Sequence, residues 1–258
     1  MFLLDSHCHL NDDRLFPEAE TLIREAYDEG VKSLLVIGWD LQSSIKAVEI
    51  ASLHDGVYAA VGYQPENTEG ADIDDLDKIA ELAKNEKVIA IGEIGLDYHW
   101  DKQEETKVRQ KRWFRKQLEL AAKLDLPVSI HSRDASEDVF EILSEVSLPR
   151  KGVLHCYSGS PEMLQRFAAL GYYFGFDGPI TYKNAKTPKE CVVQCPLDRL
   201  LSETDSPYLP PTPHRGETNY PKYIPLIVNQ IAELRGDSAE NIALAIKSNF
   251  ERLFHVKL

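Results

Sequence analysis

The sequence Val88-Ile89-Ala90-Ile91-Gly92-Glu93 decides the fold of this chain. Its short apolar run predicts a buried strand, and a carboxylate follows where that strand should end. Similar apolar runs, each followed by polar residues and then by the periodicity of an amphipathic helix, recur along the whole chain. Strands that alternate with helices in this way predict a parallel sheet with crossover helices.

Eight strand-then-helix units account for the chain. The predicted strands are Phe2–Asp5, Ser33–Ile37, Val57–Val61, Val88–Gly92, Pro127–Ile130, Gly152–Leu154, Tyr172–Phe176 and Arg199–Ser202. The predicted helices are Pro17–Glu29, Leu41–His54, Asp74–Asn85, Glu104–Leu124, Ala135–Val146, Pro161–Leu170, Pro188–Gln194, Tyr220–Leu234 and Ala239–Phe254. At about 32 residues per unit, the 258 residues match a (β/α)8 barrel, so residues 1–258 are expected to form a single TIM-barrel domain. An open doubly wound sheet is the alternative, but no strand precedes a glycine-rich nucleotide-binding loop.

The charge of the chain limits its partners. It carries 29 basic and 42 acidic residues, a formal net charge of −13. Binding of nucleic acid by a polybasic surface alone is therefore excluded. A nucleic-acid enzyme remains compatible, because bound divalent metals and a few local arginines can make a cleft positive on an acidic body.

The start of the chain and its cysteines predict a cytoplasmic protein. No apolar stretch reaches the roughly 18 residues of a membrane span, and the first residues lack the basic and apolar regions of a signal peptide. Four scattered cysteines are too few for a disulfide framework in a chain of this length. We expect no membrane association and no obligate protein partner.

Four histidines fall where predicted strands end. His7 and His9 follow the first strand two positions apart, so they point to the same side and can hold one ion together. His131 and His155 close the fifth and sixth strands. A single histidine at such a place is more often a hydrogen-bonded structural residue. Two at equivalent positions of adjacent strands favour a metal site, because the carboxyl ends of barrel strands carry the active site.

Carboxylates complete the predicted site. Glu93 closes the fourth strand, and Glu203 and Asp205 stand two positions apart after the eighth. Burying a carboxylate at the barrel mouth is costly unless a positive charge meets it. Each could alone be a solvated loop acid, but together with four histidines they favour metal binding. Asp97 is better explained by a turn or a helix cap, and Asp134 by a cap on the following helix.

This donor set predicts a two-metal hydrolase. Imidazoles mixed with carboxylates suit Zn²⁺, Mn²⁺, Ni²⁺ or Fe²⁺, and Mg²⁺ less well. Six ligands exceed the needs of one tetrahedral zinc ion, whereas two ions about 3.5–4 Å apart would use them all. Such a pair activates a hydroxide near neutral pH, and Asp205 is expected to hold the water and accept its proton. A serine hydrolase has no candidate nucleophile, since no Gly-x-Ser-x-Gly sequence is present.

From end to end the chain resembles the TatD-like metal-dependent hydrolases, also known as TatD-type deoxyribonucleases, a branch of the amidohydrolase-type barrels. Five motifs, in order and at matching strand ends, carry the resemblance and are highly specific. They are Asp5-Ser6-His7-Cys8-His9-Leu10, Gly92-Glu93-Ile94-Gly95-Leu96-Asp97-Tyr98, Leu126-Pro127-Val128-Ser129-Ile130-His131-Ser132-Arg133-Asp134-Ala135, His155-Cys156-Tyr157-Ser158-Gly159 and Ser202-Glu203-Thr204-Asp205-Ser206-Pro207-Tyr208-Leu209.

The resemblance implies a dinuclear site in a TIM barrel of the metal-dependent amidohydrolase type. Glu203 would stand beside the metals as an acid–base or water-orienting group. Family members are described as metal-dependent deoxyribonucleases, typically 3′-to-5′ exonucleases, so DNA with single-stranded or frayed ends is the implied substrate. The implied metal ligands are His7, His9 and Asp205 for one ion, His131 and His155 for the other, and Glu93 as a bridge.

The chain departs from the family pattern at one position. After the third strand the family commonly has Gly-x-His-Pro, whereas this chain has Gly62-Tyr63-Gln64-Pro65. Glutamine cannot carry a proton as imidazole does, so Gln64 can provide neither proton transfer nor a charged phosphate contact. The expected metal ligands are untouched by this change, and Gln64 is kept as a substrate-binding candidate.

Other substrate-binding candidates border the same mouth. Arg133 shares the side of His131 and could bind a phosphate through two hydrogen bonds; a salt bridge to Asp134 is the alternative. His214 and Arg215 lie in the proline-rich loop after strand eight, which could contact substrate or simply tie that strand to its helix. Candidate surfaces for stacking on a base, or else packing residues, are Tyr157, Tyr98 and Trp100.

A small-molecule amidohydrolase or deacylase is the second candidate function, because the same metal cage can attack an acyl carbon. The acidic net charge and Gln64 favour it, whereas Arg133, Arg215 and the family resemblance favour phosphodiesters. A catalytically silent binding module is the third candidate. It predicts the loss of Asp205 or of a histidine, and none of these residues is missing.

Overall fold

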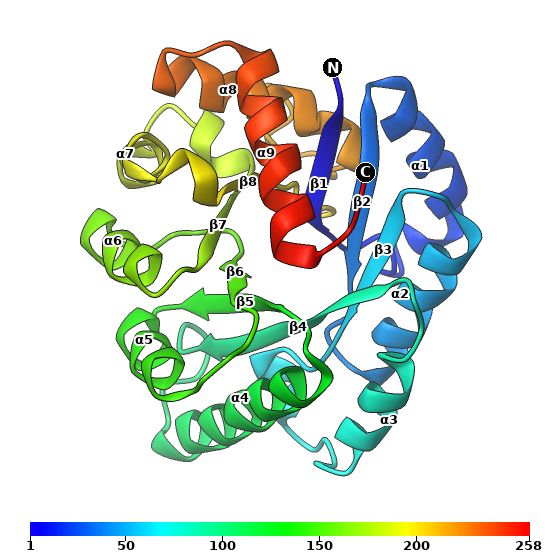
Figure 1. The fold of residues 1–258 in the computed structure, drawn as a ribbon, viewed down its shortest axis with the longest axis vertical. Coiled ribbons are helices and arrows are strands. Elements are labelled where there is room, and N and C mark those ends of the chain that lie inside the picture. The colour runs from blue at the N-terminus through cyan, green and yellow to red at the C-terminus, as the bar shows by residue number, and fades with distance from the viewer.

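Eight parallel strands pair side by side in chain order, from β1 to β8. The computed structural model describes residues 1–258 and has these strands at the centre of the molecule with helices around them (Figure 1). This confirms the predicted TIM barrel. The strands are β1 Leu3–Cys8, β2 Val31–Ile37, β3 Val57–Val61, β4 Val88–Asp97, β5 Val128–Arg133, β6 Gly152–Leu154, β7 Tyr173–Phe176 and β8 Leu200–Ser202.

Helices follow the strands, as the sequence pattern predicts. They are α1 Ala19–Asp28, α2 Leu41–Leu53, α3 Asp75–Leu82, α4 Glu104–Leu124, α5 Ser136–Glu145, α6 Pro161–Ala169, α7 Lys186–Gln194, α8 Ile224–Arg235 and α9 Ala239–Phe254. Several begin at a side-chain cap: Asp40 before α2, Ser160 before α6 and Ser238 before α9 each accept a hydrogen bond from a backbone N–H of the first turn. These caps satisfy donors that have no partner within the helix.

The eighth strand closes the barrel against the first. Beyond the end of β8, the backbone N–H of Asp205 donates to the carbonyl of His7 near the end of β1 over 2.9 Å, and the N–H of His9 donates to the carbonyl of Ser206 over 2.7 Å. The segment after β8 therefore lies directly beside the end of β1. This closure is what places Asp205 next to His7 and His9.

The strands at the centre of the site are longer than predicted. β4 ends at Asp97 rather than at Gly92, and β1 and β5 also continue past their apolar runs. The prediction ended each strand where its apolar residues ended, but backbone pairing does not require apolar side chains. Asp97 is still paired with Arg133 of β5. Polar side chains that face the mouth are thus held on paired strand backbone.

Helix α9 covers the N-terminal end of the barrel. It lies across the strands in Figure 1 and contacts β1 and β8. Its inner side chains Ile246, Phe250 and Phe254 are at most 2% exposed and belong to the hydrophobic core. Burial of each such side chain contributes about 1.5–3 kcal/mol to stability.

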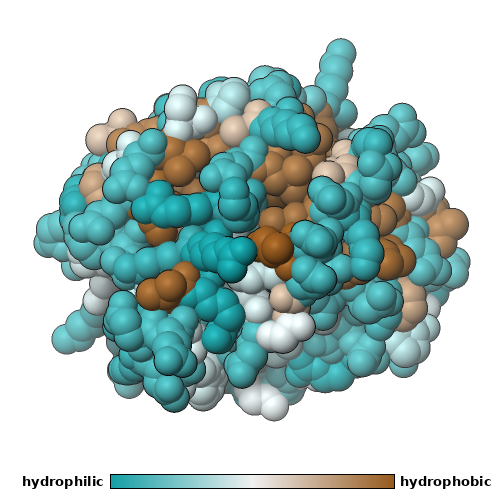
Figure 2. All heavy atoms as spheres, turned by 90° about the horizontal axis from the view of Figure 1, so that it is seen from below, coloured by the Kyte–Doolittle hydropathy of each residue, from teal (hydrophilic) through white to brown (hydrophobic).

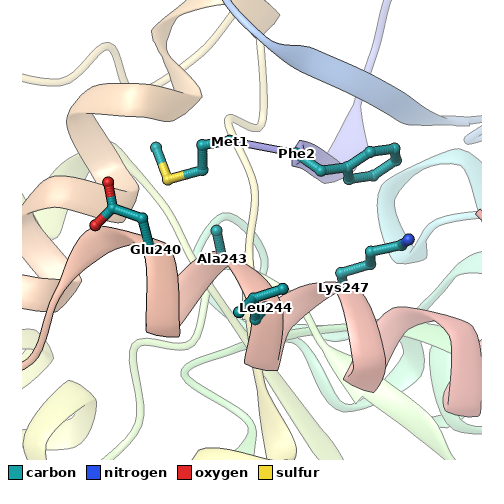
Figure 3. Close-up of a pocket in the computed structure, with 6 residues that line it drawn as sticks. All are labelled: Met1, Phe2, Glu240, Ala243, Leu244 and Lys247. Atoms are coloured by element: carbon teal, nitrogen blue, oxygen red, sulfur yellow. The ribbon is translucent and has the colours of Figure 1, made fainter.

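A small, mostly apolar hollow of about 200 Å³ remains at this end. Figure 3 shows Met1 and Phe2 above Ala243 and Leu244 of α9. Its remaining lining residues are Glu240 and Lys247, whose charged groups lie at its two ends (Figure 3). No histidine or cysteine lines it, so it does not resemble a metal site.

The outer surface of the helix ring is mostly hydrophilic. Figure 2 shows the side of the molecule near α3 and α4, where hydrophilic residues predominate and hydrophobic atoms are visible between them in separate places. None of the helices combines the length and the apolar character needed to cross a membrane.

Candidate metal centre

The six predicted metal ligands converge at the C-terminal ends of the strands. They come from both halves of the chain, and their side chains range from fully buried for His7 to 23% exposed for His131. Their positions are His7 on β1, His9 directly after it, Glu93 on β4, His131 on β5, His155 directly after β6 and Asp205 after β8.

His7, His9 and Asp205 form the first group of donors. The Nε2 atoms of the two histidines lie 3.2 Å apart, and Asp205 Oδ1 lies 3.3 Å from His9 Nε2 and 3.7 Å from His7 Nε2. Two neutral imidazole nitrogens cannot satisfy each other when both present lone pairs. A cation between them resolves this, and a carboxylate beside them balances its charge.

Glu93 connects this group to the second pair of histidines. Its Oε1 lies 2.8 Å from His131 Nδ1 and 3.0 Å from His155 Nε2. Its Oε2 lies 3.7 Å from His9 Nε2 and 3.8 Å from His7 Nε2. Each carboxylate oxygen therefore faces a different imidazole pair, as a carboxylate shared by two metal ions would.

The far side of three imidazoles is held by a hydrogen-bond partner. Such outer contacts set the tautomer and the orientation of a metal-ligating histidine, so the nitrogen that faces the centre is free to ligate. The outer pairs are His9 Nδ1 with the carbonyl of Ile37 at 3.0 Å, His7 Nδ1 with Ser129 Oγ at 3.2 Å, and His131 Nε2 with Asp97 Oδ2 at 2.9 Å.

Asp97 combines the predicted turn role with a role that sequence reasoning missed. It accepts a hydrogen bond from the backbone N–H of His99 over 2.8 Å, as a turn residue would. Its other oxygen meets His131, and a carboxylate behind a ligating histidine increases the basicity of the imidazole. The spacing of the two acids could have predicted this contact. Asp97 follows Glu93 by four positions, so on a continuous strand both side chains point to the same face.

The charges of the metal-free site favour the protonation states that ligands need at Glu93 and His7, but not at His9 and His131. Burial acts to lower the pKa of His9, yet its hydrogen bond to Asp205 and the charge of that carboxylate raise it above its usual value. Burial alone would raise the pKa of Glu93, but the charges of His155 and His131 hold it well below its usual range. Burial and repulsion from His155 lower the pKa of His7 well below its usual value. Burial acts to lower the pKa of His131 too, yet the hydrogen bonds that its ring donates to the carboxylates of Asp97 and Glu93 raise it to about 10. Metal binding must therefore displace a proton from His131.

The donor set fits divalent cations. The ligand atoms of His7, His9 and Asp205 lie within 4.8 Å of one another, and so do those of His7, Glu93 and His155. A mixture of imidazole and carboxylate donors suits Zn²⁺, Mn²⁺ and Ni²⁺.

Glu203 lies behind His155 and is fully buried. Its Oε1 is 3.9 Å from His155 Nδ1, and the backbone N–H of Cys156 and the hydroxyl of Ser6 donate hydrogen bonds to its carboxylate. Burial and the charge of Asp177 raise the pKa of Glu203 well above its usual value. The Nδ1 atom of His155 has no hydrogen-bond partner, so Glu203 does not fix this ring through a hydrogen bond, and its acid–base or water-orienting role stays a prediction.

Two hollows open on the metal centre. The larger holds about 410 Å³ and has an apolar side formed by Pro179 and Leu209. The smaller holds about 300 Å³ and is lined by Gln64, Glu66 and Trp100. A substrate that spans the centre therefore meets different chemistry on its two sides. The residues shared by both hollows are His131, Arg133, His155, Asp205 and Tyr208.

Arg133 is available to bind an anion. The alternative salt bridge to Asp134 is absent, because Asp134 pairs with His99 at 3.2 Å. The guanidinium of Arg133 lies over the ring of Trp100, 5.1 Å from its centroid. The predicted helix-capping role of Asp134 is wrong as well, since Ala135 is the N-cap residue of α5 and no side chain caps it.

Two of the three aromatic candidates are packing residues. Tyr157 is 6% exposed and its hydroxyl donates to the carbonyl of Ser160, which turns the ring into the core; Tyr98 is 7% exposed. The prediction that Tyr157 contacts substrate is therefore wrong. Trp100 is 68% exposed beside the smaller hollow. Tyr208 is 47% exposed at both hollows, a position that sequence reasoning did not single out.

The loop after β8 does not bring its basic residues to the centre, contrary to prediction. His214 stacks on Tyr223 with ring centroids 4.1 Å apart and pairs with Glu217 at 3.0 Å. It lines a separate surface hollow near α8. Arg215 lies over the ring of Tyr182, 4.2 Å from its centroid, and lines neither hollow of the metal centre. Aromatic contacts with Tyr223 and Tyr182, which lie outside this loop, hold the two side chains away from the mouth.

Comparison with known proteins agrees with this site. The family described as TatD related DNase matches residues 4–255. YabD from Bacillus subtilis (strain 168), named an uncharacterized metal-dependent hydrolase, is 44% identical over 255 residues, which cover 98% of this chain and 99% of YabD. YcfH from Escherichia coli (strain K12), named in the same way, is 37% identical over 260 residues, which cover 99% of this chain and 97% of YcfH.

A solved structure agrees equally well in three dimensions. The crystal structure of YjjV, a TatD homologue from Escherichia coli K12, superposes with a TM-score of 0.94 at 33% sequence identity, covering 99% of this chain and 98% of YjjV. The family match, the two hydrolase relatives and this superposition all extend over nearly the whole chain. The chain therefore belongs to the TatD family of metal-dependent hydrolases.

Proposed function

We propose that this protein is a deoxyribonuclease that hydrolyses phosphodiester bonds from the 3′ end of DNA with two divalent metal ions. The observation that carries the proposal is Glu93, whose two oxygens face two different imidazole pairs. Pairs of ions that share a carboxylate recur in enzymes that cleave phosphodiesters. The family description, TatD related DNase, supports the same substrate class.

The ligands divide into two sets around Glu93. When bound, a pair of divalent ions supplies Lewis acidity toward phosphoryl oxygens and a nucleophilic hydroxide near neutral pH. His131 gives up its proton to become a ligand, while Asp97 keeps its ring in place. The sets are His7, His9 and Asp205 for one ion and His131 and His155 for the other.

Asp205 handles the proton of the attacking water. Its side chain is 13% exposed and borders both hollows, so water reaches it from either side. A carboxylate within hydrogen-bond reach of the nucleophile acts as a general base. Glu203, buried 3.9 Å from His155, is proposed as a second acid–base or water-orienting group, the role that the family resemblance implies.

Arg133 and two exposed aromatic rings hold the DNA. The guanidinium of Arg133 has no carboxylate partner and can bind a phosphate through two hydrogen bonds. Trp100 and Tyr208 stand beside the hollows, and aromatic faces of this kind stack on unpaired bases. Stacking requires bases that are not paired, which favours single-stranded or frayed 3′ ends.

Hydrolysis of labelled single-stranded DNA tests the proposal. Metal-free protein is resupplied with Mg²⁺, Mn²⁺ or Zn²⁺ and incubated with 5′-labelled or 3′-labelled strands. We expect the 5′-labelled strand to shorten stepwise and the 3′-labelled strand to release a labelled mononucleotide at once. The Asp205→Asn variant should give neither product. Absence of cleavage with every metal, despite bound ions, would reject the nuclease assignment.

A substitution at Arg133 tests the placement of the phosphate. Arg133→Gln should raise KM for DNA by about 10–100-fold, the loss expected for hydrogen bonds to a charged group, with a smaller change in kcat. Arg24→Gln, on the exposed face of α1, makes the same change in net charge and should leave KM unaltered. Equal effects of the two substitutions would contradict a specific phosphate contact.

A small-molecule amidohydrolase is the second candidate, favoured by the smaller hollow. Gln64 is neutral there, and Glu66 adds a carboxylate whose pKa is raised by burial and by the charge of Asp97. A hollow lined by Gln64 and Glu66 suits an uncharged or cationic substrate group better than a second phosphate. Hydrolysis of N-acyl amino acids by a protein that leaves DNA intact would favour this candidate.

A further inference from the structure

We propose that the segments after β6, β7 and β8 form a third divalent-metal site, made by Cys156, Asp177 and Asp205 and suited to a thiolate-binding ion such as Zn²⁺. The site adjoins the predicted dinuclear centre through Asp205. It rests on the proposed function only through that shared residue. None of the five sequence motifs contains Asp177.

The three side chains meet although they come from three different strand ends. One ligand atom of each residue lies within 4.8 Å of the corresponding atoms of the other two. Donor atoms around a tetrahedral zinc ion lie roughly 3.4–3.6 Å apart, given Zn–S of about 2.3 Å and Zn–O of about 2.0–2.2 Å. Small side-chain rotations therefore suffice to bring the three donors onto one ion.

The burial of Asp177 is an independent indication of a ligand. Asp177 is only 3% exposed, and its Oδ2 has no hydrogen-bond partner. No lysine, arginine or histidine forms an ion pair with it, and its nearest ionisable neighbours include the carboxyl groups of Glu203 and Asp205. A buried carboxylate without a partner is strongly unfavourable. A divalent cation held with Cys156 and Asp205 supplies the missing partner.

The arrangement of Asp205 allows it to serve both sites. Its Oδ1 faces His7 and His9, which leaves the second oxygen of the same carboxylate for another ion. Cys156 and Asp205 both line the larger hollow, so an ion bound there keeps an open position toward substrate. Three protein ligands with one open position is the pattern of a reactive zinc site rather than a closed structural one.

The sulfur ligand gives the proposed site a distinctive signal. The ligands of the predicted dinuclear centre are nitrogen and oxygen atoms, so Co²⁺ bound there produces no thiolate-to-metal charge transfer. Co²⁺ bound to Cys156 produces such a band in the near ultraviolet. The full-length protein is stripped of metal and titrated with Co²⁺ while the absorbance is recorded, and bound ions per chain are counted by mass spectrometry after gel filtration.

We expect the charge-transfer band in the unaltered protein and its loss in Cys156→Ser and in Asp177→Asn, with each variant binding about one ion fewer per chain. Cys191→Ser is the matched control, because Cys191 is a buried thiol whose contact with the carbonyl of Gly159 a hydroxyl can replace. That control should keep both the band and the ion. Thermal melting of each variant checks that it is folded.

The alternatives give different results. A band that never forms, or one that persists in Cys156→Ser, overturns the site. A band that survives Asp177→Asn at full intensity and stoichiometry removes Asp177 from it and overturns the proposal as stated. DNA hydrolysis is recorded separately. If the band appears but DNA is not cleaved, the third metal site is supported and the nuclease function is rejected. If DNA is cleaved but the band does not appear, the nuclease function is supported and the third site is rejected.

Discussion

The two ends of the barrel are built from the same eight strands but bury different kinds of side chain, apolar at one end and ionisable at the other. At the N-terminal end, α9 packs Phe250 and Phe254 into the core beside a mostly apolar hollow of about 200 Å³ (Figure 3). At the C-terminal end, imidazoles and carboxylates are buried around hollows of about 410 and 300 Å³. The difference shows that the residues that stabilise the fold and the candidate metal ligands lie at opposite ends of the barrel.

The separation has an energetic reason. Buried polar groups that lack partners, such as the Oδ2 of Asp177, destabilise the fold until a cation meets them. The apolar packing at the other end offsets this because it needs no ligand. Substitutions at the two ends should therefore affect different measurements, and each of the following experiments tests that difference.

The largest effect is expected from Asp205→Asn at the C-terminal end. Loss of the general base should lower kcat by about 10²–10⁴-fold, and weaker metal binding should lower it further. The melting temperature of the metal-free protein should not fall, because no apolar contact is lost. Asp13→Asn, at a 93% exposed carboxylate, is the control. A variant with an unaltered rate would refute the role of Asp205.

At the N-terminal end, Phe250→Ala should act on stability alone. Removal of this fully buried ring should lower the free energy of unfolding by about 3–5 kcal/mol, measured by urea denaturation. The kcat per folded molecule should stay the same. Leu244→Ala, on the same helix but 65% exposed, should change stability by no more than about 0.5 kcal/mol. A fall in kcat comparable to that of Asp205→Asn would break the separation of the two ends.

Removal of metal should destabilise the protein through the C-terminal end. An ion present at about 100 times its Kd contributes about 2.7 kcal/mol per site, which corresponds to a fall in Tm of roughly 5–10 °C on chelation. Calorimetry before and after chelation measures it. Phe250→Ala should show the same metal-dependent shift from a lower starting Tm, because its cavity lies at the other end. A shift that disappears in this variant would mean that the two ends are coupled.

The smallest effect is expected from pH in the metal-free protein. The pKa of His131 is about 10 in the fold, above its usual value of 6.5, because Asp97 and Glu93 outweigh burial. Its stabilising contribution is thus complete below pH 6.5 and is lost as the pH rises toward 10. Tm should decline across this range, by roughly 2–4 °C for each kcal/mol lost. His131→Gln should flatten the decline, and an equal slope in this variant would exclude His131 as its source.

Local features of the sequence were sufficient to predict which polar side chains converge at the C-terminal ends of the strands. His7, His9, Glu93, His131, His155 and Asp205 were all predicted from polar residues that interrupt apolar runs, and the structure brings all six together. The prediction worked because parallel strands of a barrel present their carboxyl ends at one face. Residues that end strands are therefore neighbours even when they are far apart in the chain.

Side chains beyond the strand ends were predicted less well. Tyr157 was expected at the mouth but is buried, and His214 was a candidate for substrate contact but stacks on Tyr223. Asp97 was expected in a turn and also meets His131. In each case a hydrogen bond or an aromatic contact determines the direction of the side chain, with a partner that is 3 residues away for Tyr157 and 34 residues away for Asp97. No periodicity along the chain records such a contact.

The sequence by itself determined the barrel and the convergence of six candidate ligands, because both depend on alternation and spacing within short segments. Its five motifs carried the resemblance to the hydrolase family. Only the tertiary structure decided that Glu93 divides its oxygens between two histidine pairs, that Arg133 lacks a carboxylate partner, and that Asp177 is buried beside Cys156. The physical reason is that burial and pairing depend on which side chains meet across the closed barrel. Those meetings are fixed by packing between segments distant in sequence, most directly by the closure of β8 against β1.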